Sequence, residues 1–316
     1  MSLFLVKRLI TLIATLVGTS VVVFLVLEVL PGNAAQILMG PDAAADVVAA
    51  MARKLGLDRT PLERYWDWVG GLLRGELGLS HAYSVPVGEL VLERLTLTVP
   101  LALLAMLFTT VLALAAGIYA AARHNKLGDV SIMGLTQIGI AIPNFWFAIL
   151  LILLFSVHLR WFSAGGFPGW EEGLLPGLRA LLLPALSLAV VQSAILARIT
   201  RSAVLEVSRE DFVRTARAKG VTQRGALWGH VLRNALIPVV TVMGLQFAEL
   251  LAGTIVVESV FYLPGLGRLI FQSIANRDLI VVRNCVMLLA AMVVAVNFVV
   301  DVLYAVIDPR VKASDI

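Results

Sequence analysis

The chain has 316 residues, of which 59% are hydrophobic before its 25 glycines are counted, and only 15% are charged. Soluble domains hold about 45–50% apolar residues with glycine included and about 25% charged residues. This composition therefore excludes a soluble enzyme, a nucleic-acid-binding protein and a disordered segment. The net charge of +4 fits lysine and arginine at the cytoplasmic face of a membrane protein. The single cysteine, Cys285, excludes an internal disulfide framework and a cysteine-based zinc site.

Six apolar stretches are long enough to cross a bilayer, which takes about 20 helical residues. The first is too long for a signal peptide and is followed by no small-residue cleavage site, so we interpret it as an uncleaved helix. Pro143 predicts a kink in the third, because proline removes a backbone donor. The sequence therefore predicts an all-α integral membrane protein with six transmembrane helices, at residues 9–27, 96–122, 130–157, 181–199, about 234–257 and about 284–300.

Basic residues predict the orientation of these spans. Residues 198–233 carry eight lysines and arginines, and Arg123 and Lys126 lie in the short connection between the second and third spans. Lysine and arginine concentrate in short cytoplasmic loops, so both termini are predicted to lie in the cytoplasm.

Residues 31–95 then lie outside the cytoplasm, and they are predicted to form helices rather than strands. Apolar residues recur at helical spacing after Asp42, which can cap a helix that Gly56 ends. The run Thr60–Glu63 has the form of a capping box with proline at the first helical position. The helix that follows carries aromatic residues, which we interpret as headgroup anchors. A docking surface for an extracytoplasmic partner is the alternative for these residues: Tyr65, Trp66 and Trp68.

A polar element lies between the fourth and fifth spans. Residues 207–219 favour a helix, Gly220 to Thr222 interrupt it, and residues 224–236 can be helical again. A helix–glycine–helix element too polar for lipid suits a groove of a soluble subunit. The simpler alternative is a basic loop held against anionic lipid, and these residues alone favour it.

Several motifs, in order along the chain, resemble the permeases of ABC importers, specifically the dipeptide, oligopeptide and nickel permease family. Residues 214–220, read as Arg-Thr-Ala-Arg-Ala-Lys-Gly, and the run Arg233–Pro238 are similar to that family's EAA loop. Two positions depart from the motif: Arg214 stands in place of its glutamate, and Leu232-Arg233 in place of its Leu-Pro. Four further stretches agree with the family: Leu55–Asp58 with Gly75–Ser80, Pro143–Trp146, Phe261–Arg268 and Asp308–Val311.

The resemblance implies a type I ABC importer permease fold and a division of labour. The chain would be one of two homologous permease subunits in the bacterial inner membrane. Two cytoplasmic ATPases would bind ATP and magnesium, and an extracytoplasmic binding protein would deliver a small peptide or a related solute such as a nickel chelate, haem or glutathione. Coupling to the ATPases would fall on Arg214, Thr215, Ala216, Arg217, Ala218, Lys219 and Gly220.

The chain itself carries no phosphate-binding loop and no hydrolase or zinc-protease motif, so we expect it to be no enzyme and to hold no cofactor or metal. Its expected organisation is a cytoplasmic N-terminus and first helix at 1–30, the extracytoplasmic segment at 31–95, a core permease domain at 96–305 with a coupling loop at about 205–234, and a cytoplasmic tail at 306–316.

Polar side chains inside the spans indicate where a translocation path runs. On the fifth helix Met243, Gln246, Glu249 and Gly253 share one face, and on the sixth Asn297, Asp301 and Tyr304 share another. A charge at bilayer depth costs about 2.5–3.5 kcal/mol on insertion scales, so it must face protein or water. The predicted path residues are Gln246, Glu249, Gly253 and Asn297.

The alternative for such residues is a structural hydrogen bond between helices, worth about 0.6 kcal/mol on average. We favour it for the acids near span ends, Glu28, Glu258 and Asp301. The same region holds Gln137, Asn144 and Gln192.

Two other classes of function compete with an importer. In a proton-coupled secondary transporter Glu249 or Glu258 would carry the proton, but such folds often contain inverted repeats and we find none between the halves. A membrane scaffold without transport would leave the polar helix–glycine–helix element unexplained.

Overall fold

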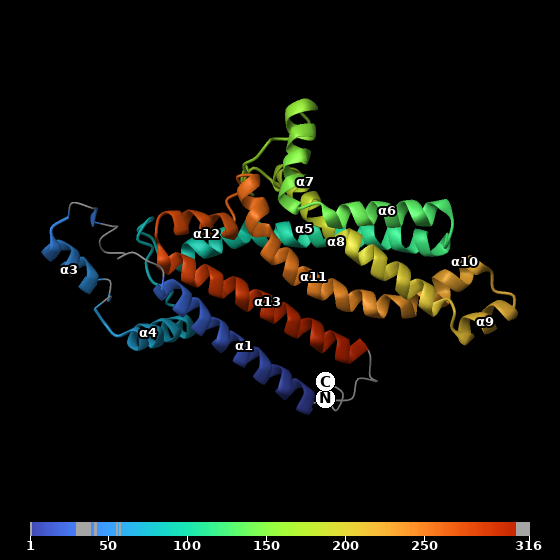
Figure 1. Cartoon of the computed structure of the whole chain (residues 1–316), viewed down its shortest axis with the longest axis horizontal. Helices are drawn as coiled ribbons and strands as arrows, with labels where there is room; N and C mark the ends of the chain where they lie inside the picture. The colour runs from blue at the N-terminus through green and yellow to red at the C-terminus, as the bar shows by residue number, and fades with distance from the viewer. Residues whose placement is uncertain (1, 30–38, 41–42, 55, 57, 308–316) are drawn as a thin grey trace.

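The computed structural model describes residues 2–29, 39–40, 43–54, 56 and 58–307, and Figure 1 shows the whole chain. Five helices in these residues are long and apolar enough to cross a membrane. They are α1 (Ser2–Val29), α5 (Val87–Ala122), α8 (Leu174–Val207), α11 (Leu232–Val260) and α13 (Leu279–Ile307). Within the described ranges the sole strand-like pairing is the isolated bridge between Leu79 and Pro86, which confirms the all-α prediction.

The sixth crossing is broken in two. Helix α6 (Leu127–Ala141) is followed, after a bend of 102°, by α7 (Asn144–Leu151) and the π-helix η1 (Ile152–His158). The sequence predicts a kink at Pro143, and the structure shows a full break there. Ile142 and Pro143 are both extended at the break, with ψ of 122° and 137°. The conformation of Ile142 follows from the next residue, because proline forces the residue before it out of the helical region.

Contacts hold the chain to the bundle near the start of this bent pair and after its end. Asp129, near the start of α6, pairs with Arg201 near the end of α8. Beyond η1, the backbone N–H of Gly166 donates to Phe261 O at 2.9 Å, and Trp170 Nε1 donates to Thr96 O at 2.9 Å. The described residues therefore hold five unbroken candidate spans and one bent pair, which agrees with the six predicted spans when the pair is counted as one.

The core of the bundle is the contact between α5 and α8. Small residues let the two helices approach closely: a Cβ added to Gly117 would lie 2.6 Å from Ala197 O. Packing of small residues is a main source of helix association in membranes, where lipid is as apolar as the side chains. Buried leucines of both helices, among them Leu101, Leu181 and Leu188, pack around α11.

Short helices cover the two ends of the bundle. One end carries α9 (Asp211–Ala218), α10 (Gln223–Ala226) and the π-helix η2 (Leu227–Val231), which leads directly into α11. The other end carries α3 (Ala45–Lys54), α4 (Pro61–Arg74) and α12 (Leu266–Ala275). In Figure 1 α1 begins toward the first of these ends and α13 finishes there.

The predicted boundaries are corrected at several places. Helix α5 starts at Val87 rather than near residue 96, and α8 extends from Leu174 to Val207. The helix expected at 207–219 is shorter, Asp211–Ala218, because α8 occupies Val207 and a turn follows it. The predicted cap at Asp42 lies outside the described residues.

The predicted capping box at the start of α4 is confirmed. Thr60 Oγ1 accepts from the Glu63 N–H, and the Glu63 carboxylate accepts from the Thr60 N–H at 2.9 Å. The carboxylate also accepts from Thr60 Oγ1 at 2.9 Å, and its hydrogen bonds from the Thr60 N–H and hydroxyl lower the pKa of Glu63, so it is ionised at neutral pH.

Candidate translocation path and coupling loop

A seam of amides and one carboxylate joins α8 to α11 in the middle of the bundle. Gln192 Nε2 donates to Glu249 Oε2 at 3.0 Å. Gln246 Nε2 donates to the backbone oxygen of Gln192 at 3.0 Å and to its Oε1 at 3.1 Å. Gln246 is buried in this seam, whereas Glu249, one turn later, is exposed on the outside of the chain. The structure therefore brings these two predicted residues together through Gln192, in unequal environments.

Gly253 lies one turn beyond Glu249, where α11 meets both α8 and the broken span. A Cβ at this position would be 3.3 Å from Leu188 Cδ2 and 4.0 Å from Asn144 Nδ2. Asn144 is the first residue of α7, directly after the break. Glycine at this point allows the close approach of three helical segments.

Two amide oxygens of this region are buried without a hydrogen-bond partner in the described part of the chain: Asn144 Oδ1 and Gln246 Oε1. Buried acceptors are normally satisfied by protein or ordered water. The region thus offers unused acceptors beside the Glu249 carboxylate.

The other predicted path residue, Asn297, lies on α13. It is half-buried, and its Oδ1 is buried with no hydrogen-bond partner among the described residues. No hydrogen bond in those residues joins it to Gln246 or Glu249. Of its expected neighbours on the helix, Asp301 pairs with Arg8 of α1 at 3.0 Å, and the side chain of Tyr304 lies outside the described residues.

The acids near span ends have structural partners, as the sequence predicts. Besides the Asp301–Arg8 pair, Glu28 at the end of α1 pairs with Arg64 of α4. Glu258 is buried and accepts hydrogen bonds from Thr98 and from the first turn of α12.

The predicted coupling residues form α9 and the turn after it. Gly220 has a φ of +92°, a conformation that side chains with a Cβ rarely adopt, and the space around its missing Cβ is open. Thr222 then caps α10 by accepting from the Gly225 N–H at 3.2 Å. Buried Val213 and Ala226 fasten the element to a cluster that includes residues of α5 and α8.

The outer surface of this element is charged. Arg214, Thr215, Arg217, Ala218 and Lys219 are exposed, and Ala216 is half-buried. Arg214 pairs with Asp211 one turn earlier at 3.2 Å. Most of these side chains are therefore free to contact another molecule, while the apolar side of the element faces the bundle.

Gln192 and Asn144 are the residues of this site to which sequence reasoning gave no role. Both are polar residues inside predicted spans, which is the available signal, but neither is ionisable. Their contact with α11 depends on how α7, α8 and α11 pack, and helical periodicity within one segment does not reveal this packing.

Comparison with known proteins places these features in a family. The family described as binding-protein-dependent transport system inner membrane component matches residues 113–313, and its N-terminal companion family matches residues 1–102. A glutathione transport system permease protein, GsiC of Escherichia coli strain K12, is 40% identical over 309 residues, covering 98% of each chain. A putative peptide transport system permease protein of Brucella abortus strain 2308 is 40% identical over 312 residues, covering 99% of each.

A solved structure supports the fold. An inward-facing form of the MetNI methionine ABC transporter has a chain that aligns with a TM-score of 0.57 at 18% identity, covering 69% of this chain and 96% of that one. The two families together match nearly the whole chain, and this match excludes the secondary-transporter and scaffold alternatives. The chain belongs to the family of binding-protein-dependent transport system inner membrane components, and it is a permease subunit of an ABC importer.

Proposed function

We propose that this permease subunit forms half of the path of an ATP-driven importer for short peptides or a peptide-like solute such as glutathione. A second homologous permease subunit, two cytoplasmic ATPases and an extracytoplasmic binding protein would complete the transporter, in the inner membrane of a bacterium. The solute class is supported by relatives that are named as glutathione and peptide transport permeases and are 40% identical over nearly the whole chain.

The exposed carboxylate of Glu249 is the observation that carries the proposed path. An ionised side chain on the outer surface of a span would be costly against lipid, so it must meet water or another chain. The second permease subunit supplies both, because a path between two subunits is wet and covered. Gln192 links buried Gln246 to Glu249 by hydrogen bonds, and Gly253 lets α11 approach Leu188 of α8 one turn later. Asn297 supplies a further acceptor from α13.

We assign the end of the bundle that carries α9 and α10 to the cytoplasm. The eight basic residues at 198–233 support this orientation under the positive-inside rule. It would place the start of α1, the end of α13 and the charged surface of α9 on the side where ATP is available. The ATPase would seat α9 and the Gly220 turn in a groove and transmit its closure to α8 and α11.

The experiment is a reconstituted transporter, with its ATPases and binding protein, carrying Gly220→Glu or Gly220→Asn. Asparagine tolerates a positive φ far better than other residues do, whereas glutamate brings both strain and charge. We expect Gly220→Glu to leave membrane insertion intact and to abolish solute-stimulated ATP hydrolysis and uptake, and Gly220→Asn to keep most of both. Normal coupling in the Gly220→Glu transporter would refute the assignment of this loop.

A further inference from the structure

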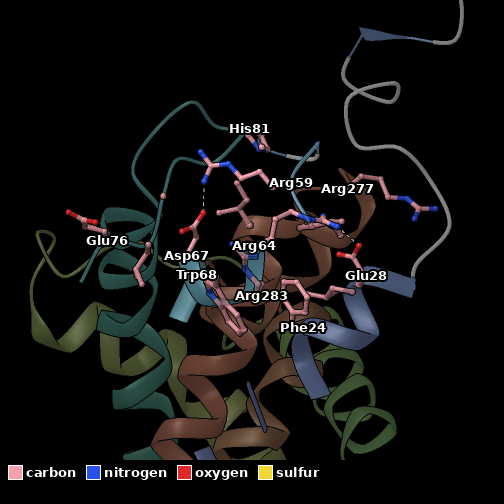
Figure 2. A pocket seen from close by; sticks show the side chains of 16 residues that line it. Phe24, Glu28, Arg59, Arg64, Asp67, Trp68, Glu76, His81, Arg277 and Arg283 are labelled. Atoms are coloured by element: carbon pink, nitrogen blue, oxygen red, sulfur yellow. Dashed lines mark hydrogen bonds and ion pairs between the residues drawn. The ribbon is translucent and has the colours of Figure 1, made fainter. Parts of the chain in front are cut away.

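A cavity of about 420 Å³ lies at the end of the bundle opposite α9 and α10. It is bounded by the end of α1, by α4, by the segment 76–81 and by the start of α13. Figure 2 shows its charged and aromatic side chains, with Arg64, Trp68, Arg283 and Phe24 grouped above the ends of the helices. Neither the proposed path nor the coupling loop uses this cavity.

The charges that line the cavity do not cancel. Three carboxylates line it, and each is paired with an arginine: Glu28 with Arg64, Asp67 with Arg59 at 2.5 Å, and Glu76 with Arg74 at 3.4 Å. Arg277 and Arg283 also line the cavity, and in the described ranges Arg283 forms no ion pair and no hydrogen bond.

Arg283 is held in place by an aromatic ring instead. Its guanidinium carbon lies 4.7 Å from the centre of the Trp68 ring, and the Trp68 Nε1 is fixed by donating to Asn284 Oδ1 at 3.0 Å. The Nε of Arg283 and that of Arg64 are both buried without an acceptor among the described residues. A cation–π contact offsets only part of the cost of taking a guanidinium out of water. Among the described residues the guanidinium of Arg283 therefore has no counter-charge in this cavity.

The position of the cavity identifies the level of the membrane at which that charge would lie. Glu28 is near the last residue of the span in α1, and Leu279 is the first residue of the span in α13. Trp66 of α4 is 62% exposed, as expected for an aromatic side chain at the headgroup layer. The same cavity has apolar walls from Phe24, Leu27 and Ile280. A ligand with a charged head and a hydrocarbon body fits such a site.

We propose that this cavity binds the phosphodiester of an anionic phospholipid, with Arg283 as the principal cation and α1 and α4 as the clamp. A phosphodiester carries one negative charge, which would supply the counter-charge that Arg283 lacks among the described residues, and arginine binds phosphate oxygens through a planar fork. The lipid would fasten α1 to α4 and α13. This matters because α1 packs mainly on α13 and touches α4 at few points.

Native mass spectrometry of the detergent-purified transporter tests this site. The transporter is incubated with phosphatidylglycerol, with phosphatidylcholine, or with phosphatidylglycerol in the presence of excess inorganic phosphate. We expect one phosphatidylglycerol per permease chain to survive activation, little phosphatidylcholine, and no displacement by phosphate. Arg283→Gln should weaken phosphatidylglycerol binding by about tenfold or more, as expected for loss of a charge-assisted hydrogen bond.

Arg268→Gln is the matched control. Arg268 also lies over an aromatic ring, 4.9 Å from the centre of Tyr262, but it does not line the cavity, so this variant should retain the lipid. If Arg283→Gln does not assemble, Arg283→Lys and the lipid preference of the unmodified transporter decide the matter. Equal retention of both lipids, full retention by Arg283→Gln, or displacement by phosphate would each overturn the proposal, the last in favour of a site for free anions.

Discussion

The buried carboxylate of Glu258 determines which residues can occupy the positions around it. Its Oε1 accepts from Thr98 Oγ1 at 2.7 Å, and its Oε2 accepts from the N–H groups of Gly267 at 2.7 Å and Arg268 at 3.3 Å. Thr98 Oγ1 in turn accepts from the Leu266 N–H at 2.9 Å. Together they satisfy the first N–H groups of α12, whose own N-cap residue, a glycine, has no side chain to do so.

Glycine is required where this carboxylate meets α12. A Cβ at Gly265 would lie 2.2 Å from Glu258 Cδ, and one at Gly267 would lie 2.2 Å from Ile255 Cα. We expect Gly265→Ala and Gly267→Ala each to destabilise the chain by about 1–3 kcal/mol through overpacking. Gly134→Ala is the control, because the space beside Gly134 is open. The single, buried Cys285 supplies the measurement, since a thiol-reactive dye reacts with it only as the protein unfolds on heating.

Sequence reasoning reached part of this arrangement. A structural role for Glu258 follows from its place near the end of a span, and the structure confirms it. The run Phe261–Arg268 could be recognised only as a resemblance. Its two glycines are required because the Glu258 carboxylate and the backbone of Ile255 pack directly against them in the folded chain. No local rule for turns or helices predicts that contact.

Glu249 tests the proposed path at the scale of one residue. Glu249→Gln removes the charge but keeps the shape and a partner for Gln192, so assembly and basal ATP hydrolysis should be unchanged. We expect uptake of an amine-bearing solute to fall by about tenfold, because the solute loses its counter-charge. A tenfold change corresponds to about 1.4 kcal/mol of free energy. Glu89→Gln, an exposed glutamate in the first turn of α5, is the control. Loss of the permease dimer in Glu249→Gln would instead show a structural role.

At the scale of elements, an ion pair fastens the start of the broken span to α8. Arg201 donates from Nε to Asp129 Oδ1 at 2.5 Å and from Nη2 to Oδ2 at 2.7 Å. Asp129 is 2% exposed and also accepts from the Asn125 N–H at 2.9 Å. Because α8 leads directly toward α9, this pair links α6 to the coupling loop.

Breaking this pair should loosen α6 from α8. We expect Asp129→Asn and Arg201→Gln each to lower the free energy of unfolding by about 2–3 kcal/mol, because each variant leaves the other charged side chain unpaired in a buried site. The double variant should cost less than the two single changes added together, which a double-mutant cycle on thermal unfolding would show. Strict additivity would mean that the two side chains act independently.

The elements themselves were largely predictable, and the errors share a cause. Hydropathy located the spans, but it placed the start of the second near residue 96, because Glu89, Glu93 and Arg94 interrupt the apolar run although α5 already begins at Val87. Proline located the break before α7, but the angle of 102° depends on what α7 packs against. Composition reports the membrane environment, whereas helix ends and bends depend on packing.

At the scale of the molecule, α4 and residues 77–82 are fastened to the start of α13. Asp278 Oδ2 accepts from Ser80 Oγ at 2.6 Å and from the Ala82 N–H at 3.0 Å. Asn284 Nδ2 donates to Leu77 O at 2.7 Å, while its Oδ1 accepts from Trp68. The helical character of α4 was predictable from its capping box, but these contacts join residues about 200 positions apart in sequence and no short-range pattern reveals them.

The two ends of the bundle can be assigned to sides of the membrane by cysteine labelling in intact cells. Asp58 lies beside α4 and Arg217 in α9, both are exposed, and the native Cys285 is buried and gives little background. We expect an impermeant maleimide to label Asp58→Cys and to leave Arg217→Cys unlabelled until the membrane is permeabilised. The physical reason is the concentration of basic residues around α9, which are retained on the cytoplasmic side during insertion. The reverse labelling pattern would show the opposite orientation in the membrane. The end that carries α9 would then face away from the cytoplasmic ATPases, which would refute coupling through Gly220.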